Sequence, residues 1–447
     1  MLQHSIRAKF TYNNISLNGK HVKYIYKETI SYDKNSSRLE INMKICVIGA
    51  GAQGSVIAKI LADDPEIDKV VLADINTQLL QRVAKKIDSS KLITERVDAS
   101  NSDDLAKVMK GADVVVNATL AYFNSIIFRS ALKHGVNYVD FAENWPLREN
   151  FLENLKASDE WRKAGLTAVK SQGITPGVTN VLARYAADHL DKVEEIHVRS
   201  GWRNPSVEDK IVPTWAPGWS VETALLMWTA DPIVYEDGEY KTYPPFSGVE
   251  THMFPEMGPH TLCWVEHDEV VTLPHFIGKG VKYVDFRESL DVIAGILVNL
   301  GFAGTEPIEV KGVKVKPLDV LLKLVKPAID EIEEMEKASE FQKLSGEEVY
   351  SCNAVQVIGE KDGKKVEQYI YLTTSIADMR EWLQRYGTTN GWVPIPGAAT
   401  AKMLATGEIQ AKGVIAPECL EPEPFLRKLS EMGMGTFRMI TKRQVSE

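Results

Sequence analysis

The chain has 447 residues, of which 44% are hydrophobic and 25% are charged, as in a typical globular protein. This length predicts two or three domains. The formal net charge of −9 argues against the broad positive surface that nucleic acid or an anionic membrane would require. No apolar run approaches the roughly 18 residues of a membrane span, and the first residues do not show the charged-then-apolar order typical of a secretory signal. We therefore predict a cytoplasmic protein with neither nucleic-acid nor membrane partners.

The first 42 residues differ from the rest because they are rich in Asn, Ser, Tyr and Lys and show no sustained helical period. We predict that 1–42 is a poorly ordered N-terminal extension without chemistry. The chain has four cysteines, and no two of them form a C-x-x-C pair. The sequence therefore favours neither a disulfide framework nor a metal site.

From residue 43 onward, short β-rich runs alternate with helical segments. Predicted strands cover 44–49, 70–74, 92–97, 114–117, 138–140 and 166–169, and predicted helices cover 56–61, 77–87, 102–110, 124–134 and 149–164. Strands separated by helices indicate a parallel sheet with right-handed crossovers. The region 43–170 is therefore predicted to be a doubly wound α/β domain of the Rossmann type.

A glycine-rich turn follows the first strand of this region. Its residues are predicted to hold the pyrophosphate of a dinucleotide at the N-terminus of the next helix, and they are Gly49, Gly51, Ala52, Gln53 and Gly54. Asp74 ends the second strand, twenty residues after Gly54. A carboxylate there accepts hydrogen bonds from the ribose and repels a 2′-phosphate, which favours NAD over NADP and leaves NADP open.

Two further strand ends are predicted to contact the dinucleotide. Asp98 and Ala99 follow the third strand, where such folds often line the adenine. The residues after the fourth strand pass the nicotinamide end, and they are Asn117, Ala118 and Thr119.

Beyond about residue 190 the alternation of strands and helices ends. Strands are predicted at 196–201 and 263–273, helices at 288–300 and 317–343, and a small-residue helix at 396–406. The runs 355–359 and 367–373 flank Asp362-Gly363, which predicts a β-hairpin. This mixture predicts an α+β substrate domain.

Four segments together resemble the saccharopine dehydrogenase-like oxidoreductases, a family that includes lysine 6-dehydrogenase and carboxynorspermidine dehydrogenase. They are GAGAQG (49–54), NATLAYFN (117–124), ALKHGVNYVDFAEN (131–144) and GITPGVTNVLARYAAD (173–188), and the region 391–429 resembles the closing segment of the family. The resemblance implies that 171–390 is a mixed α+β catalytic and dimerisation domain. It also implies that 391–430 returns to complete the Rossmann domain, that 431–447 is a C-terminal tail, and that the protein is a homodimer.

The resemblance further implies hydride transfer between nicotinamide and the carbon of a C–N bond in an amino acid or opine. A saccharopine-like secondary amine ranks first as the substrate, free lysine second and a carboxynorspermidine-type polyamine precursor third. An alternative of a different class is a non-catalytic NAD(H)-binding redox sensor, because the glycine turn and Asp74 fit both readings.

The chemistry requires a group that manages the proton on the substrate nitrogen. Asp140 is the first candidate, because it ends the strand 138–140 and ligands bind at the carboxyl ends of such strands. Glu143 and Tyr122 are the other two candidates for catalytic residues.

The loop after residue 170 is predicted to close on the ligands. Gly173 and Pro176 are expected beside the nicotinamide, and Gly177 and Asn180 beside the substrate. Arg203 is the preferred partner for a substrate carboxylate because arginine offers a planar fork of donors. His267 is predicted to face the substrate cleft.

Overall fold

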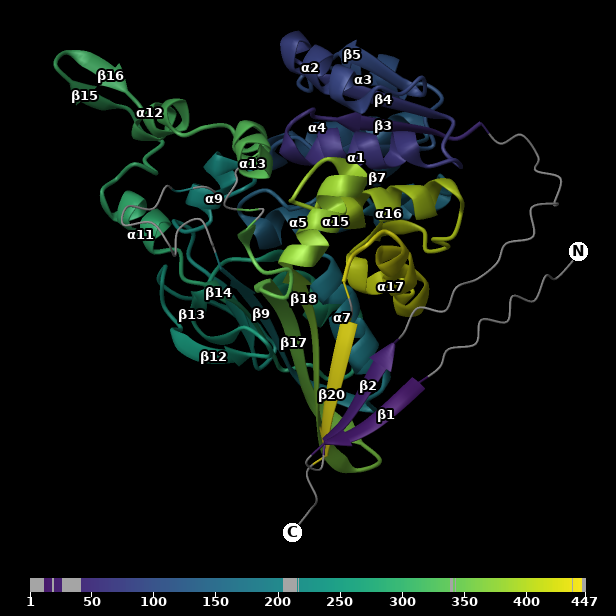
Figure 1. Cartoon of the computed structure of the whole chain (residues 1–447), viewed down its shortest axis with the longest axis vertical. Coiled ribbons are helices and arrows are strands. Elements are labelled where there is room, and N and C mark those ends of the chain that lie inside the picture. Colours follow the sequence, from purple (N-terminus) through teal and green to yellow (C-terminus); the bar gives the residue numbers. More distant parts are fainter. Residues whose placement is uncertain are drawn as a thin grey trace, which may run out of the picture.

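The computed structural model describes residues 12–17, 20–25, 42–203, 215, 217–337, 341, 343–435 and 437–443. Figure 1 shows two bodies, with a parallel sheet and its helices at the top and a long mixed sheet below. In the described residues no helix has both the length and the apolar character needed to cross a bilayer.

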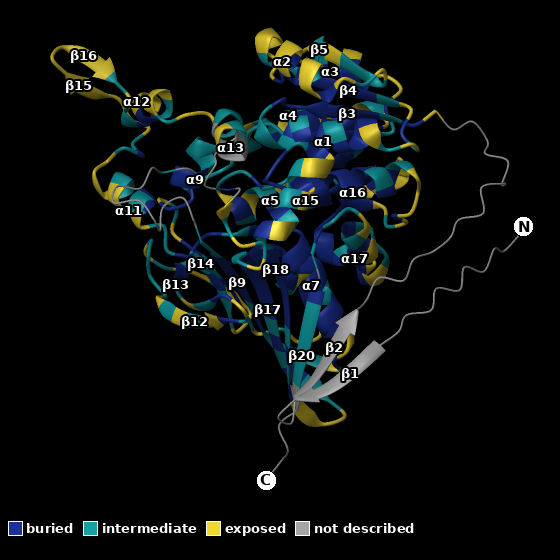
Figure 2. Ribbon diagram, viewed as in Figure 1, coloured by how far each residue is buried: buried dark blue, intermediate teal, exposed yellow. Residues whose placement is uncertain are grey.

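A seven-stranded parallel sheet forms the first body, in the order β19-β8-β7-β6-β3-β4-β5. Its strands are β3 (Lys44–Ile48), β4 (Lys69–Asp74), β5 (Leu92–Arg96), β6 (Val114–Asn117), β7 (Asn137–Val139), β8 (Thr167–Val169) and β19 (Gly413–Ile415). The helices between them are α1 (Ala52–Asp63), α2 (Thr77–Ile87), α3 (Ser102–Met109), α4 (Asn124–His134), α5 (Leu147–Lys156) and α6 (Ser158–Lys163), with a short 3-10 turn η1 (Ala121–Phe123). Most of the central strand residues are buried, as Figure 2 shows, because helices cover both faces. The predicted Rossmann-type sheet is confirmed.

The C-terminal part of the chain returns to this first body, as predicted. Strand β19 pairs in parallel with β8 at the edge of the sheet. Helix α16 (Pro394–Ala405) packs against α1, and α17 (Pro422–Glu431) follows after the 3-10 turn η2 (Pro417–Cys419). At Gly397 an added Cβ would lie 2.5 Å from the ring of Phe141, so the small residues of α16 permit this close approach.

The second body is built on an eleven-stranded mixed sheet whose main path runs β1-β2-β20-β18-β17-β9-β14-β10-β11. Its strands are β9 (Lys192–Trp202), β10 (Ile233–Glu236), β11 (Glu239–Thr242), β12 (Glu250–Phe254), β13 (Gly258–Trp264), β14 (Tyr283–Ser289), β17 (Val349–Lys361), β18 (Lys364–Ser375) and β20 (Phe437–Arg443), together with β1 (Tyr12–Leu17) and β2 (Lys20–Ile25). Three helices of this body, α7 (Val178–Asp188), α10 (Asp268–Ile277) and α15 (Ile376–Tyr386), contact its strands. The hairpin predicted at Asp362-Gly363 is confirmed. Strands β17 and β18 are antiparallel, and their last pair, Lys361 with Lys364, encloses the two-residue turn.

One predicted strand of this body differs from the structure. The predicted strand at 263–273 is wrong, because β13 ends at Trp264 and α10 begins at Asp268. Asp268 and Glu269 occupy the first helical turn, where negative charge is favoured, and Val270, Val271 and Leu273 are buried.

The terminal segments contribute strands that the sequence did not reveal. Within the predicted extension 1–42, β1 pairs with β2, and β2 pairs with β20 of the predicted tail 431–447. Strands β2 and β20 lie near opposite ends of the chain, so the local sequence of neither strand indicates that the two pair.

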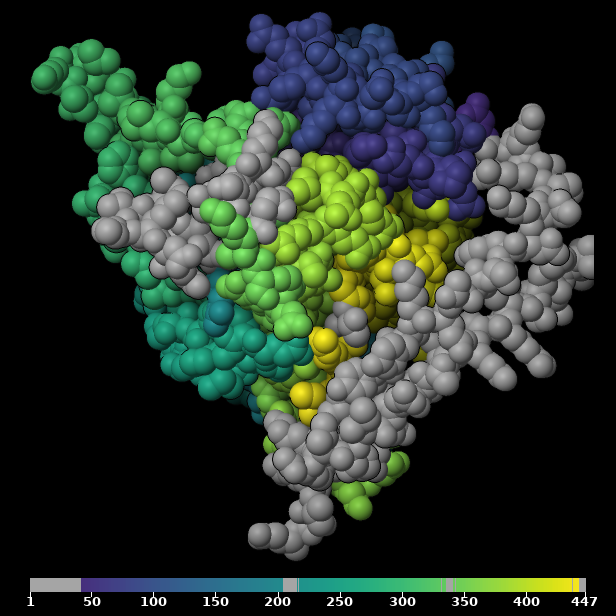
Figure 3. Space-filling view, in the orientation of Figure 1, coloured from purple at the N-terminus to yellow at the C-terminus, as the bar shows by residue number. Residues whose placement is uncertain are grey.

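A projecting arm leaves the second body and returns to it. It contains α11 (Val292–Asn299), the hairpin of β15 (Ile308–Val310) and β16 (Val313–Val315), and α12 (Pro317–Leu324). Figures 1 and 3 show this arm standing away from the rest of the molecule. After the arm, α13 (Ala328–Lys337) comes back into contact with α1 of the first body.

Candidate functional site

A cavity of about 2340 Å³ lies between the two bodies, and the predicted cofactor residues gather along one side of it. Eleven of the thirteen line it: Gly49, Gly51, Ala52, Gln53, Asp74, Asp98, Ala99, Asn117, Ala118, Thr119 and Pro176. Gly54 and Gly173 are not among the lining residues. The carboxyl ends of β3, β4 and β6 therefore open on the same space, as expected for a dinucleotide site.

The glycine turn is shaped to let a ligand approach its backbone. Gly49 has φ of 101°, and a Cβ there would lie 2.5 Å from the carbonyl oxygen of Ala118. A Cβ at Gly51 would meet nothing within 4 Å, so this backbone faces open space. The side-chain amide of Gln53 lines the cavity, and both of its polar atoms are buried without a hydrogen-bond partner. These features fit a bound pyrophosphate, which would accept hydrogen bonds from such donors.

Asp74 also shapes this turn. Its Oδ2 accepts a hydrogen bond from the Ala50 amide at 2.7 Å, and its Oδ1 accepts one from the Asn76 amide at 2.8 Å. The carboxylate thus connects the end of β4 to the glycine turn after β3. Each oxygen keeps a second lone pair that could accept a ribose hydroxyl.

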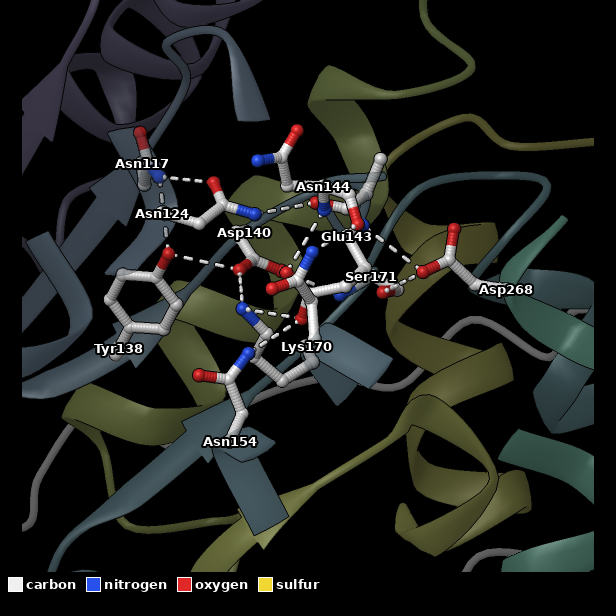
Figure 4. A network of polar contacts seen from close by, with 12 residues as sticks. Asn117, Asn124, Tyr138, Asp140, Glu143, Asn144, Asn154, Lys170, Ser171 and Asp268 are labelled. Carbon is white, nitrogen blue, oxygen red and sulfur yellow. Dashed lines mark hydrogen bonds and ion pairs between the residues drawn. The ribbon is translucent and has the colours of Figure 1, made fainter. Parts of the chain in front are cut away.

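Behind the cavity lies a buried network around Lys170, shown in Figure 4. The ammonium of Lys170 is fully buried and pairs with the carboxylate of Asp140, and it lies 3.3 Å from Glu143 Oε2. Tyr138 donates to Asp140 Oδ2 at 2.9 Å, and the Ser171 amide donates to Oδ1 at 2.7 Å. Burial raises the pKa of Asp140 even though the nearby Lys170 opposes that change. The Lys170 ammonium thus neutralises part of the charge of two buried carboxylates, Asp140 and Glu143.

This network reaches the cavity through Glu143 and Asp268. Both residues line the cavity, whereas Asp140 and Lys170 do not. The Glu143 amide donates to Asp268 Oδ1 at 3.0 Å, and Ser171 Oγ donates to the same oxygen at 2.9 Å. Asn154 donates to Glu143 Oε2 at 2.7 Å. The orientation of the two carboxylates is therefore fixed by groups that lie behind the cavity wall (Figure 4).

His267 forms a second polar unit on the cavity wall. Its Nδ1 donates to Glu269 Oε2, and Thr179 Oγ1 donates to Glu269 Oε1 at 2.7 Å. The imidazole stacks on Phe286, with ring centroids 3.7 Å apart. Burial lowers the pKa of His267, but the carboxylates of Glu269, Asp268 and Glu288 together raise this pKa overall, with Glu269 contributing most. The arrangement leaves Nε2 as the ring nitrogen that can exchange a proton in the cavity.

The substrate end of the cavity is rich in carboxylates. Six of them line it: Glu143, Glu222, Glu266, Asp268, Glu288 and Asp291. Burial raises the pKa of Asp268 to about 6 and the pKa values of Glu266 and Glu288 to about 7. The described residues on the wall include three arginine and lysine side chains, Arg203, Lys326 and Lys343, and two histidines, His260 and His267. Lys326 pairs at 2.6 Å with Glu334, which also lines the cavity. An environment of this kind favours a positively charged ligand.

Aromatic rings complete the wall of the cavity. Trp202 donates through Nε1 to Glu288 at 3.2 Å, and Trp215 donates to Asp291 at 2.9 Å. These bonds hold indole rings beside two of the carboxylates. Aromatic faces and carboxylates together form a suitable surface for alkyl ammonium groups.

The structure brings together some of the predicted site residues and separates others. Glu143, Arg203 and His267 line the cavity. Asp140, Gly177 and Asn180 lie behind its wall, and Asn180 donates to Thr272 and Glu418, each at 3.0 Å. Tyr122 is 56% exposed and is not on the wall.

Sequence reasoning missed Lys170 and five of the six carboxylates at the substrate end of the cavity, all except Glu143. We call these six carboxylates the acidic wall. Lys170 directly follows β8, as Asp140 follows β7, and the two strands pair through Val139 and Val169. The rule that selected Asp140 applies equally to Lys170 and would have found it. The acidic residues come from several helices, strands and loops, so no single local motif contains them.

Two family models together match most of the chain. The saccharopine dehydrogenase NADP binding domain matches residues 45–169, and the saccharopine dehydrogenase C-terminal domain matches residues 173–434. The boundary between the matches falls in the loop that follows Lys170.

Two relatives are similar over most of the sequence. One is carboxyaminopropylagmatine dehydrogenase from Synechocystis sp., 27% identical over 405 residues, and the other is carboxynorspermidine synthase from Vibrio cholerae, 27% identical over 420 residues. Each alignment covers 88% of this chain and 96% of the relative.

Two solved structures share the fold. Saccharopine dehydrogenase (L-Glu forming) from Saccharomyces cerevisiae has a TM-score of 0.62 and 16% identity, over 90% of this chain and 100% of that chain. Homospermidine synthase from Legionella pneumophila, solved in complex with NAD, has a TM-score of 0.61 and 14% identity, over 90% of this chain and 92% of that chain.

Proposed function

The chain belongs to the saccharopine dehydrogenase family of NAD(P)-dependent oxidoreductases, and from this premise we propose that its substrate is a cationic amine of the polyamine type. The reaction is oxidation, or reductive formation, of a CH–NH bond. The non-catalytic sensor reading has no observation in its favour.

The acidic cavity wall is the observation that carries the choice of substrate. Six carboxylates line the substrate end of the cavity, whereas the described residues of the whole wall include three arginine and lysine side chains. Polyamines and their carboxylated derivatives carry several ammonium groups, which carboxylates stabilise. Saccharopine carries more carboxylates than amines and would face repulsion there. The names of both relatives also point to amines of this class. The polyamine precursor therefore moves ahead of saccharopine and lysine.

The residues of the site supply binding, orientation and proton transfer. When bound, the nicotinamide accepts or donates the hydride. In the oxidative direction the substrate carbon loses a hydride and its nitrogen loses a proton, which leaves a C=N bond that water can hydrolyse. Glu143 and Asp268 hold the cationic nitrogen by charge. His267 Nε2 takes the proton in oxidation and returns it in reduction, while Glu269 stabilises the protonated ring.

We propose NAD as the preferred nucleotide, with NADP as the alternative. The support is Asp74, whose carboxylate stands at the end of β4 and is held there by two backbone amides. A negative charge at this position disfavours the 2′-phosphate of NADP.

We also propose that the protein is a homodimer in which the projecting arm contacts the second copy. In the β15–β16 hairpin, Ile308 pairs with Val315 and Val310 pairs with Val313, so one face of the hairpin is wholly apolar. Ile308, Val310 and Val313 are exposed. An isolated two-stranded hairpin is marginally stable, and an exposed apolar face favours burial against another chain. Sedimentation of a Val310→Lys variant should show a shift toward monomer, and an unchanged dimer would contradict this role.

The test of function is an assay of NADH and NADPH formation at alkaline pH. The amines compared are carboxynorspermidine, carboxyaminopropylagmatine, saccharopine and lysine. We expect the highest kcat/KM for one of the two polyamine derivatives. Glu222→Gln and Glu288→Gln should each lower this kcat/KM about tenfold, chiefly by raising KM, since each removes roughly one charge contact. Glu239→Gln, which removes an exposed charge on β11, is the control. Preference for saccharopine or lysine would refute the proposed substrate class.

A further inference from the structure

Helix α13 belongs to the second body of the molecule, yet it reaches the nucleotide side of the cavity. Three of its residues that line the cavity are Ala328, Ile329 and Ile332. Ile332 is 7% exposed, so this face of the helix is packed. Figures 1 and 3 show the green segment that contains α13 adjacent to the purple and blue segments of the first body.

Two ion pairs connect α13 to α2 of the first body. Arg82 Nη1 lies 2.7 Å from Asp330 Oδ1, and Lys86 Nζ lies 3.6 Å from Glu333 Oε1. Helix α2 begins at Thr77, three residues after the end of β4 at Asp74. The ion pairs therefore place α13 beside the element that follows the ribose-binding carboxylate. In a doubly wound fold this is the position of the adenosine half of the dinucleotide.

On the first body, an exposed apolar side chain faces the same space. Ile75 follows Asp74, lines the cavity and is 56% exposed. Leu79 of α2 also lines the cavity. An exposed isoleucine on a cavity wall loses contact with water when a flat apolar group covers it. Adenine is such a group, and an apolar side chain on its other face would enclose it further, as a second wall.

We propose that α13 supplies this second wall, so that the adenine lies between Ile75 of the first body and Ile329 of the second. The proposal rests on the cofactor binding stated under the proposed function. The ion pairs involve partly exposed side chains and contribute little by themselves. The bound adenosine therefore adds an apolar contact between the two bodies on this side of the cavity, and the second body contributes directly to nucleotide affinity.

The experiment compares ligands that carry different halves of the dinucleotide. ADP-ribose carries the adenosine half, and reduced nicotinamide mononucleotide carries the other half. We expect Ile329→Ser to weaken the binding of ADP-ribose and of NADH about fivefold to tenfold, and to leave the binding of the mononucleotide unchanged. Dissociation constants come from calorimetry or from fluorescence. Ile75→Ser should have the same effect. Because Ile75 is exposed, this substitution should not disturb folding.

A control variant and a double variant make the test specific. Val320→Ser changes an exposed valine of α12 that does not line the cavity, and it should leave all three affinities unchanged. If the two isoleucines contact the same ring, the double variant Ile75→Ser/Ile329→Ser should weaken ADP-ribose binding by less than the product of the single effects. ADP-ribose affinities within twofold of wild type in both single variants would overturn the proposal. An equal loss for both halves would also overturn it, by indicating a displaced domain. Wild-type protein that binds neither NADH nor ADP-ribose would refute the cofactor site itself, and this proposal with it.

Discussion

The ammonium of Lys170 lies 3.3 Å from Glu143 Oε2, and both side chains are buried. Glu143 borders the cavity and Lys170 does not. The charge that the cavity presents at Glu143 is therefore controlled by a cation that a ligand does not touch. Asp140 pairs with the same ammonium. Removal of Lys170, Asp140 or Glu143 therefore changes the net charge that surrounds the remaining two side chains.

Lys170→Met should destabilise the protein strongly. The variant leaves Asp140 and Glu143 buried without their cation, and breaking a buried pair in this way costs about 3–5 kcal/mol. Urea unfolding measures the change in free energy. The double variant Lys170→Met/Asp140→Asn should recover part of the loss, because one buried negative charge is removed as well. A single variant that loses less than about 1 kcal/mol would contradict the proposed balance of charges.

Asp140→Asn should lower turnover much more than cofactor affinity. The carboxylate contacts Lys170, Tyr138 and the Ser171 amide, and it does not line the cavity. It therefore acts indirectly, by holding the Lys170 ammonium that positions Glu143. We expect kcat to fall about 10- to 100-fold, as for other residues that orient a catalytic group, with the NADH dissociation constant nearly unchanged. The pH profile should shift as well, since Lys170 would then serve Glu143 alone. Full activity of the variant would remove Asp140 from the site.

The predictable parts of this protein follow local rules, and the unpredictable parts depend on long-range contacts. Strands and helices of the first body could be predicted because each unit has its own apolar period, and Gly49, Gly51 and Asp74 have a fixed spacing. The acidic wall joins Glu143 after β7, Glu222 of α9 (Val221–Leu226) and Glu288 of β14. Their proximity depends on how the two bodies pack, which no local pattern encodes. The pairing of β2 with β20 was missed for the same reason.

Asp74→Ser should shift nucleotide preference toward NADP. The variant removes the charge that disfavours a 2′-phosphate, and it also removes the acceptors for the Ala50 and Asn76 amides. Both nucleotides should bind more weakly, while the ratio of the NADP to the NAD dissociation constant falls about tenfold, which corresponds to about 1.4 kcal/mol. Fluorescence titration with NADH and NADPH measures both constants. Asp88→Asn, which changes an exposed aspartate at the end of α2 that does not line the cavity, is the control. An unchanged ratio would remove the argument for NAD.

Glu269→Gln should move the pH–rate profile toward lower pH. The Glu269 carboxylate raises the pKa of His267 against the effect of burial, so its neutralisation lowers the pKa of that imidazole. In the oxidative direction His267 acts as the base and is active when neutral. The acidic limb of kcat/KM should therefore shift to lower pH in the variant, and His267→Asn should abolish that limb. If the limb keeps its position in Glu269→Gln, another group is responsible for it.

Affinity for a cationic amine should increase from about pH 5.5 to 8. Burial raises the pKa of Asp268 to about 6 and the pKa values of Glu266 and Glu288 to about 7, so these groups become charged as the pH rises through this window. Aliphatic amines stay protonated below about pH 9, since their ordinary pKa is near 10. His267, on the same wall, loses positive charge as the pH rises and so acts in the same direction.

Calorimetry with an unreactive diamine, in the presence of NADH, can test this dependence. A bound cation favours the ionised carboxylates, so binding near pH 6.5 should release protons, and the measured heat should depend on the ionisation enthalpy of the buffer. Glu288→Gln should weaken binding at pH 8 and reduce the number of protons released. Affinity that is independent of pH, or net proton uptake, would contradict the acidic wall as the amine-binding surface. Proton release that is unchanged in Glu288→Gln would instead assign the titration to Glu266 or Asp268.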